Sequence, residues 1–462
     1  MDIPVEVKRS YKDDSVAKTL IIYFPDLSFT VPISEVYKES MRLYESLLER
    51  DSIEFVGCIS SRFEVQIRNN DNYVRTLKNH RIIAYIYTEQ YPEYRIPLFH
   101  GIVDQVKKEP GKNFIKITAY DELYTKGNID VANWYKSLTF PITLGNLRVS
   151  LLNYIGLTAE TTTLPNDDIQ ISKQYDPETL QSLIVIQSIC QINGCFGIIN
   201  RDGKFEYRFL KQTVNAVYPS IAIFPSPSLY PGGSSQSPYR NAEVLGYYRL
   251  VEYQDFEVKP VDKVTIRENE TDAGVTYGNG DNNYIIQGNM FAYKLPANTL
   301  STIASRIYGK VQNISYYPYI STNNGLPYAE CGVDAVTYYY LDAQQETQNM
   351  DFYIFNRELT GIQALKDEYE CKGEEYQNEF ITDLNANVRT IQQDYDNKFK
   401  DYDYKFDEYD YKFDDYDTEF ENFNSELDDI NDILSSKEVM VVVDWDETTG
   451  ILETTSEVLS NA

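Results

Sequence analysis

Histidine is almost absent from this chain of 462 residues, which contains two, His80 and His100. The most common general base in enzymes is therefore scarce, and the sequence contains no GxSxG, P-loop, GxGxxG or HExxH motif. Acidic residues are abundant, so a hydrolase with two carboxylates stays open in principle, but no pair is singled out by its spacing. We predict a protein that is not an enzyme, with no catalytic residues and no cofactor.

Cysteine is also scarce, and the five cysteines are scattered along the chain. They are Cys58, Cys190, Cys195, Cys331 and Cys371. Their odd number, the lack of a CxxC pair and the absence of a nearby histidine argue against a disulfide framework and against a zinc site. We expect small buried thiols of the kind found in a reducing cytoplasm, and no metal site.

Basic residues and long apolar runs are lacking as well. Lys and Arg number 42 against 71 Asp and Glu, which gives a formal net charge of −29. Such a chain has no basic surface for nucleic acid or anionic lipid. No apolar run reaches the roughly 18 residues of a membrane span, and the N-terminus lacks the apolar core of a secretory signal. We expect no nucleic-acid specificity, no membrane span, and either simple solvation or a partner with a basic face.

The residues that are present predict a mainly β protein with several domains. Residues 1–125 are expected to form a small β-barrel or sandwich, because short strand-like runs follow at close intervals. In the clearest run, 62–68, apolar and polar side chains alternate as in a half-buried strand. One stretch, 34–49, has helical spacing instead and is predicted as a helix with Ser34 as its N-cap.

The next two regions are expected to be a mixed α+β insert, 126–240, and a second β-rich domain, 241–345. The elements predicted in them are helices at 144–155, 177–193 and 300–311, a hairpin at 196–209, an exposed Pro-, Gly- and Ser-rich loop at 219–240, and strands at 250–258, 264–267 and 285–288. Gly156 and Gly194 are the expected ends of the first two helices. The turn at 278–283 superficially resembles a calcium loop, but it lacks the alternating acidic positions and the distal Glu.

The C-terminal part is predicted to contain a helical region, 346–436, and a small terminal β-hairpin, 437–462. Within the helical region, five consecutive heptads begin at Tyr395, and each opens with Tyr or Phe and carries Phe or Leu at its fifth place. This four–three spacing is that of the a and d positions of a coiled coil. The predicted self-association residues are Tyr395, Phe399, Tyr402, Phe406, Tyr409, Phe413, Tyr416, Phe420, Phe423, Leu427, Ile430 and Leu434.

The charges beside the aromatic positions favour parallel helices. Lys405 at g would face Asp410 at e of a neighbouring helix, and such exposed pairs fix orientation although each contributes only about 0.5 kcal/mol. The buried rings contribute about 2–3 kcal/mol each, and their bulk favours three strands over two. Two alternatives stay open: a disordered acidic linker, and a helix packed on its own chain.

Short segments in the first 345 residues resemble a known family. Residues 98–104 followed by 115–123 resemble the N-terminal barrel of phage tail-tip and baseplate hub proteins. Residues 192–197 and 200–205 are similar to a recurrent segment of the same proteins in phages and prophages of Gram-positive bacteria. Two further stretches, 262–266 and 277–289, also fit. The resemblance covers roughly residues 40–345, and its motifs are short.

The resemblance implies a homotrimeric structural hub, in which two related barrel domains per subunit adapt a six-fold tail tube to a three-fold tip. The coiled coil would carry distal components. The implied partners are sister copies, the distal tail protein or tail tube ring, the tape measure protein, and distal tip or fibre proteins. The implied location is the virion tail tip, assembled in the host cytoplasm. A receptor-binding fibre or adhesin, favoured by the 41 tyrosines, and a peptidoglycan hydrolase stay open as other functions.

Overall fold

A computed structural model gives the fold of the chain. It describes residues 3–13, 15–48, 57–69, 76–108, 113–172, 177–210, 242–244, 248–341, 347–373, 380–383, 437–446 and 451–460. The chain divides into two compact units, Met1–Asn387 and Val388–Ala462. Among the described residues, no helix has both the length and the apolar character needed to cross a membrane.

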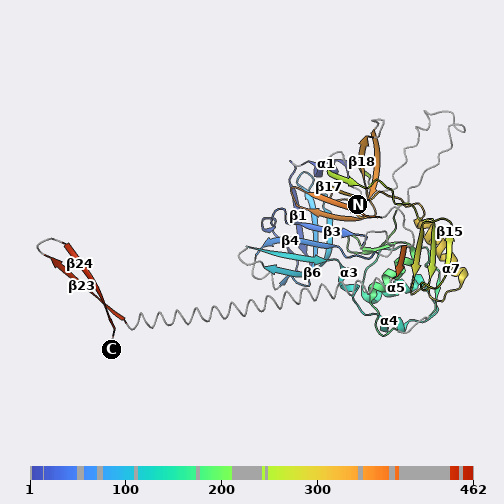
Figure 1. Ribbon diagram of the computed structural model, residues 1–462, viewed down its shortest axis with the longest axis horizontal. Helices are drawn as coiled ribbons and strands as arrows, with labels where there is room; N and C mark the ends of the chain where they lie inside the picture. The colour runs from blue at the N-terminus through green and yellow to red at the C-terminus, as the bar shows by residue number, and fades with distance from the viewer. Residues whose placement is uncertain are drawn as a thin grey trace. The chain divides into compact units, whose positions relative to one another are not determined.

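The first unit is built on an antiparallel sheet of eleven strands (Figure 1). In order across the sheet these are β13 (Tyr248–Tyr253), β17 (Tyr319–Asn324), β21 (Lys366–Cys371), β20 (Asn356–Thr360), β3 (Arg42–Ser46), β4 (Arg62–Arg68), β7 (Phe114–Tyr120), β6 (Ile96–Lys108), β5 (Arg81–Thr88), β1 (Lys18–Phe24) and β2 (Phe29–Thr30). The protein is therefore mainly β, as predicted.

The two separate small barrels predicted from the sequence are not what the described residues form. The sheet is open, and β20 pairs with β3, with Leu359 opposite Leu43, so that early and late parts of the chain share one sheet. Alternation of side chains identifies a strand and its buried face, but not the strand beside it. The domain boundaries drawn from the sequence stay predictions.

The predicted helix at 34–49 is also wrong. Its place is taken by a short 3-10 helix, η2 (Ile33–Glu35), and by β3. Met41 and Leu43, two residues apart, are both fully buried, as on one face of a strand. The hydrogen bonds of β3 go to β4 on one side and β20 on the other, and these tertiary contacts override the local spacing.

The α+β insert follows the sheet and contains α3 (Glu122–Lys126), α4 (Ala132–Ser137), β8 (Ile142–Thr143), α5 (Leu144–Ile155), β9 (Gln170–Ile171), α6 (Ser182–Asn193), β10 (Phe196–Ile199) and β11 (Phe205–Arg208). The first predicted helix and the hairpin are confirmed, and Gly156 and Gly194 end α5 and α6 in the left-handed conformation. The second helix starts later than predicted, because Ser182 and Leu183 donate instead to carbonyls of residues 129 and 127.

A second, four-stranded sheet completes the first unit together with its covering helix. The strands are β15 (Val275–Gly278), β14 (Lys263–Arg267), β16 (Asn283–Gln287) and β22 (Phe380–Asp383), and the helix is α7 (Ala297–Val311). Figure 1 shows α7 beside β15. The apolar side of α7, which includes Ile303 and Ile307, is fully buried. The helix predicted at 300–311 is therefore confirmed and begins at Ala297.

The predicted helical region 346–436 is wrong in its first part, where β19 (Thr347–Tyr353), β20, β21 and β22 lie. Here β19 pairs with β18 (Ala335–Leu341), which pairs in turn with β12 (Ala242–Val244). The rest of that region, 384–436, and the predicted loop 219–240 lie outside the described residues.

The chain begins with α1 (Val5–Lys12), and η1 (Pro25–Leu27) links β1 to β2. In the second unit, β23 (Lys437–Asp446) pairs antiparallel with β24 (Ile451–Ser460).

Candidate functional site

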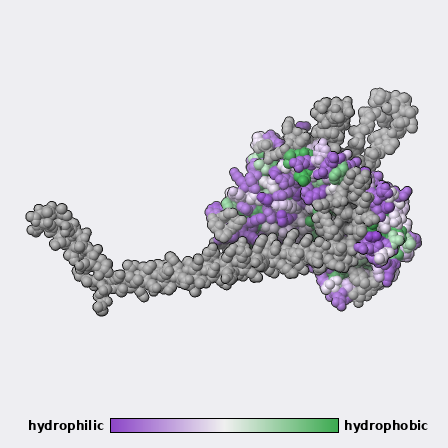
Figure 2. Space-filling view, viewed as in Figure 1, coloured by the Kyte–Doolittle hydropathy of each residue, from purple (hydrophilic) through white to green (hydrophobic). Residues whose placement is uncertain are grey.

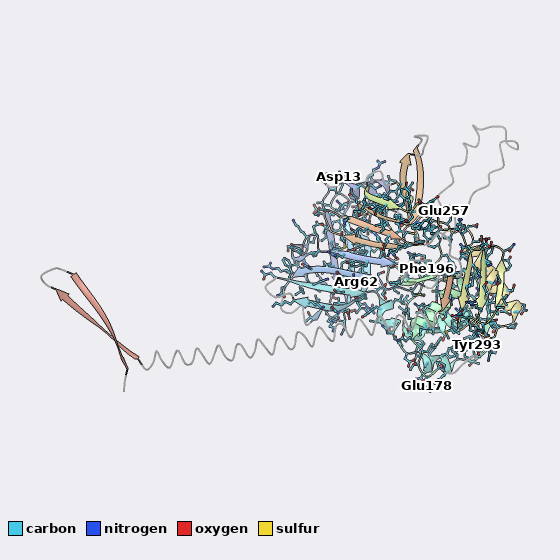
Figure 3. The ribbon with its side chains drawn as sticks, in the orientation of Figure 1. Asp13, Arg62, Glu178, Phe196, Glu257 and Tyr293 are labelled. Atoms are coloured by element: carbon cyan, nitrogen blue, oxygen red, sulfur yellow. The ribbon has the colours of Figure 1, made fainter. Side chains whose placement is uncertain are left out.

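All twelve predicted self-association residues, from Tyr395 to Leu434, lie outside the described residues. The structure instead brings together the segments that carry the family resemblance. The hairpin β10–β11 of the insert, whose first residue Phe196 is fully buried and is labelled in Figure 3, packs against residues that precede β4 of the main sheet. Its turn, 200–203, reaches the strand β6 that contains the 98–104 motif.

The contact between the turn and β6 is made by Gly203 and His100. Gly203 has a φ of +76°, and a Cβ at this position would lie 1.5 Å from the His100 Nδ1 atom. Only glycine tolerates both the backbone conformation and this close approach. The Nδ1 atom is buried without a hydrogen-bond partner among the described residues, and burial lowers the pKa of His100. The imidazole is therefore a packing surface for the turn.

Arg201 extends from the same turn and links it to two other segments. Its Nη2 donates to Oε2 of Glu45 across 3.1 Å and to the carbonyl of Ala329, and its Nη1 donates to the carbonyl of Pro327. Its side chain is 8% exposed. A guanidinium has several donors in one plane, so one side chain can hold β3 and the 326–331 segment against the hairpin.

Two more arginines converge on the same place. Arg357 of β20 donates to both oxygens of Asp367 at 2.8 and 3.1 Å, to Glu45 at 3.0 Å, and to the carbonyl of Leu326 at 2.6 Å. Burial alone would lower the pKa of Arg357, but the Asp367 and Glu45 carboxylates raise it well above its ordinary value. The guanidinium is thus a permanently charged cross-link.

The third arginine, Arg208, belongs to β11. It donates to both oxygens of Glu206 at 3.0 Å, to Glu330 at 3.2 Å and to the carbonyl of Cys331 at 2.6 Å. We call Arg201, Arg208, Arg357, Glu45, Asp367 and the segment 326–331 the arginine junction. It ties the hairpin of the insert to β3, β20 and β21 of the main sheet, and its chemistry is that of charge-assisted structural bonds.

The face of the main sheet opposite to its core carries paired charges. Nη1 of Arg42 lies 3.5 Å from Oε1 of Glu358, and Nζ of Lys116 lies 3.1 Å from Oε2 of Glu64. The guanidinium of Arg62, labelled in Figure 3, lies 4.0 Å from the centre of the Tyr44 ring. Figure 2 shows a largely hydrophilic surface on the visible face of the described residues. The Arg42–Glu358 pair is partly exposed and contributes little stability.

An open cavity of about 480 Å³ lies between α7 and the loop that precedes β9. Arg306 on its wall pairs with both oxygens of Asp168, and Asp167 pairs with Arg148.

At the 278–283 turn, Oδ2 of Asp262 accepts from the amides of Asp281 and Asn282. No group of three or more His, Cys, Asp or Glu in the described part of the chain has the arrangement of a metal site.

The arginine junction could hardly be predicted from the sequence. Arg201 lies inside a recognised motif, whereas Arg357 and Asp367 lie in a region that was predicted to be helical. Glu45, a partner of Arg357, is more than 300 residues away from it, and no local spacing marks such a pair. The expectation of buried thiols is confirmed, because all five cysteines are free and buried.

No family model matches the chain, and comparison with curated proteins finds no match. Solved structures do resemble it. The tail protein from Neisseria meningitidis MC58 is 10% identical, with 79% of this chain and 100% of that chain covered and a TM-score of 0.43. The 43 kDa tail protein of prophage MuSo2 from Shewanella oneidensis is 10% identical, with 77% and 98% covered and a TM-score of 0.47.

A third similar structure is the prophage tail protein gp18 from Listeria monocytogenes EGD-e. It is 11% identical, with 77% of this chain and 95% of that chain covered and a TM-score of 0.41. At these values the similarity defines neither a shared family nor a shared activity.

Proposed function

We propose that this chain is a structural protein of a phage tail, the hub subunit of the tail tip or baseplate, and not an enzyme. In this proposal three copies associate through the heptads that begin at Tyr395. The trimer adapts the six-fold tail tube or distal tail ring to a three-fold tip, contacts the tape measure protein, and carries distal tip or fibre proteins. The proposal rests on the residues of this chain rather than on the similar structures, whose TM-scores are below 0.5.

The observation that carries the proposal is the contact between the recognised motifs. The 98–104 and 200–205 segments are about 100 residues apart, yet His100 meets Gly203, and Arg201 joins the carbonyl of Pro97 at 3.5 Å to Glu45. Segments that resemble one family separately are thus parts of one packed junction. This supports a resemblance in three dimensions as well as in short stretches of sequence.

The route of the chain supports the role of the heptads. Residues 380–383 form β22, which pairs in parallel with β16, Tyr284 being opposite Phe380. The chain is therefore hydrogen-bonded into the first unit immediately before the region that contains the heptads.

Immunogold labelling of virions with antibodies against the first unit tests the proposed role. The hub role predicts label at the end of the tail tube. Label confined to fibre tips would favour the receptor-binding alternative instead, and label on the capsid would contradict both.

A zymogram with peptidoglycan is expected to show no clearing by the purified chain, and clearing that a heat-treated sample lacks would overturn the non-enzymatic part of the proposal.

A further inference from the structure

A cluster of thiols lies where α6 of the insert meets the segment that precedes β4, and it has no part in the proposed assembly. The Sγ atoms of Cys58 and Cys190 are 3.6 Å apart and within hydrogen-bond distance of each other. Cys58 precedes β4 of the main sheet, and Cys190 belongs to α6 of the insert. A third thiol, Cys195, donates to the carbonyl of Cys190 across 3.7 Å. Cys58 is 3% exposed and the other two are fully buried.

The hairpin holds Cys58 against α6. The amide of Gly197 donates to the carbonyl of Gly57 across 3.0 Å, and a Cβ on Gly197 would lie 2.8 Å from the Cys58 Sγ. Because Gly197 has no side chain, the Cys58 thiol has room beside it. The hydroxyl of Tyr207 is buried nearby without a hydrogen-bond partner among the described residues. The hydrogen bond between Gly197 and Gly57 thus fixes the backbone beside Cys58.

The remaining two cysteines differ from this cluster. Cys331 directs its thiol to the carbonyl of Glu45 at 3.8 Å, and Cys371 is buried on β21. All five cysteines are free in the structure. A disulfide requires two thiols that approach each other with little backbone movement, and the close pair of Cys58 and Cys190 meets that requirement.

We propose that Cys58 and Cys190 are a redox-modification site, which a peroxide converts to a disulfide that locks the insert onto the main sheet. The Cys58 thiol loses its proton, its thiolate attacks one oxygen of hydrogen peroxide, and the O–O bond breaks. The leaving hydroxide takes up that proton, so the products are a sulfenic acid and water. The Cys190 thiol then attacks the sulfenic sulfur, and a second water leaves. Two thiols are oxidised by two electrons, and the peroxide is reduced to two waters.

Cys58 is the group that reacts first in this scheme, because it is the less buried of the two. Burial raises the pKa of Cys190 well above its ordinary value, so Cys190 keeps its proton until the sulfenic acid has formed beside it. The disulfide closes a loop of about 130 residues, and long loops lose the most conformational entropy in the unfolded chain. The oxidised protein is therefore expected to unfold at a higher temperature.

Treatment of the full chain with hydrogen peroxide, followed by mass spectrometry, tests this proposal. We expect the free thiols to fall from five to three, a loss of two hydrogen atoms in the intact mass, and one linked pair of peptides that contain Cys58 and Cys190. The unfolding temperature should rise by several degrees and return after reduction. Cys58→Ser should abolish the linked peptide pair and the rise in unfolding temperature, whereas the matched control Cys371→Ser should keep them.

Peptide mapping of the unmodified sequence keeps the test decisive even if a serine variant fails to fold. Five free thiols after peroxide treatment would overturn the proposal. So would a bond between Cys190 and Cys195, or a Cys58–Cys190 bond that forms only in denaturant, because neither outcome uses the native contact between the sheet and the insert.

Discussion

The Nε atom of Arg357 donates to Oδ1 of Asp367 across 2.8 Å, and both side chains are fully buried. Asp367 also accepts from the amide of Leu326 at 2.6 Å and from the hydroxyl of Tyr369 at 2.9 Å. The ion pair is thus fully hydrogen-bonded, which is the condition under which buried charges are tolerated. Through Arg357 it connects β20 and β21 to Glu45 on β3.

Loss of one partner of this pair should be costly. Asp367→Ala leaves the buried guanidinium with Glu45 as its remaining carboxylate, and we expect a loss of about 3–5 kcal/mol in the free energy of unfolding. Urea denaturation measures it. The matched control is Glu368→Ala, which breaks an exposed pair with Lys366 and should cost less than about 1 kcal/mol. Equal losses in the two variants would contradict the assignment of the arginine junction as a structural cross-link.

Two glycine substitutions should change the stability of the protein in opposite directions. Gly203→Ala places a methyl group on the His100 imidazole at a φ of +76°, and should destabilise the protein by about 2–4 kcal/mol. Gly309→Ala, in the interior of α7, adds a Cβ that meets no atom within 4 Å, and should stabilise it by about 0.5–1 kcal/mol. Thermal unfolding of both variants checks this. A neutral Gly203→Ala variant would show that the turn does not pack on β6 as described.

Local signals in the sequence predicted the elements that local chemistry determines. The helix 144–155 was predicted correctly from its apolar residues and from Gly156, which ends it, and the hairpin from its Asn200–Gly203 turn. Strand neighbours could not be predicted. Residues 34–49 show helical spacing and, in part, a two-residue alternation. Hydrogen bonds to residues more than 300 positions away stabilise the strand β3 there instead of a helix.

The pH dependence of stability should carry a contribution from Asp121, the N-cap of α3. Burial raises its pKa to about 7, although the amides of Ser61 and Leu123 donate to its carboxyl group. The folded state therefore holds this proton up to about pH 7, whereas the unfolded state releases it near pH 4. The contribution to stability is complete below pH 4 and is lost as the pH rises to 7.

Asp121→Asn keeps a good capping side chain but removes this titration. Between pH 4 and 7 the variant should gain stability relative to the unmodified protein, by up to about 4 kcal/mol. Urea unfolding of both proteins over this pH range gives the difference directly. Parallel stability curves would show that Asp121 stays ionised in the folded protein throughout.

The proposed self-association depends on the aromatic positions of the heptads. Replacing Phe406, Tyr409 and Phe413 together by Ser removes three rings that contribute about 2–3 kcal/mol each in every helix, and should dissociate the trimer. Tyr404→Ser combined with Tyr411→Ser is the matched control, since both positions are f in the same heptads and face away from the proposed seam. Chemical cross-linking should give trimers for the control and monomers for the triple variant.

The mass of the full chain in solution, measured by light scattering over a range of concentrations, tests the central claim most directly. The proposed hub predicts three times the chain mass of 53.5 kDa, stable to dilution. A mass of one chain at every concentration would contradict the trimer, and with it the proposed adaptation from a six-fold tube to a three-fold tip.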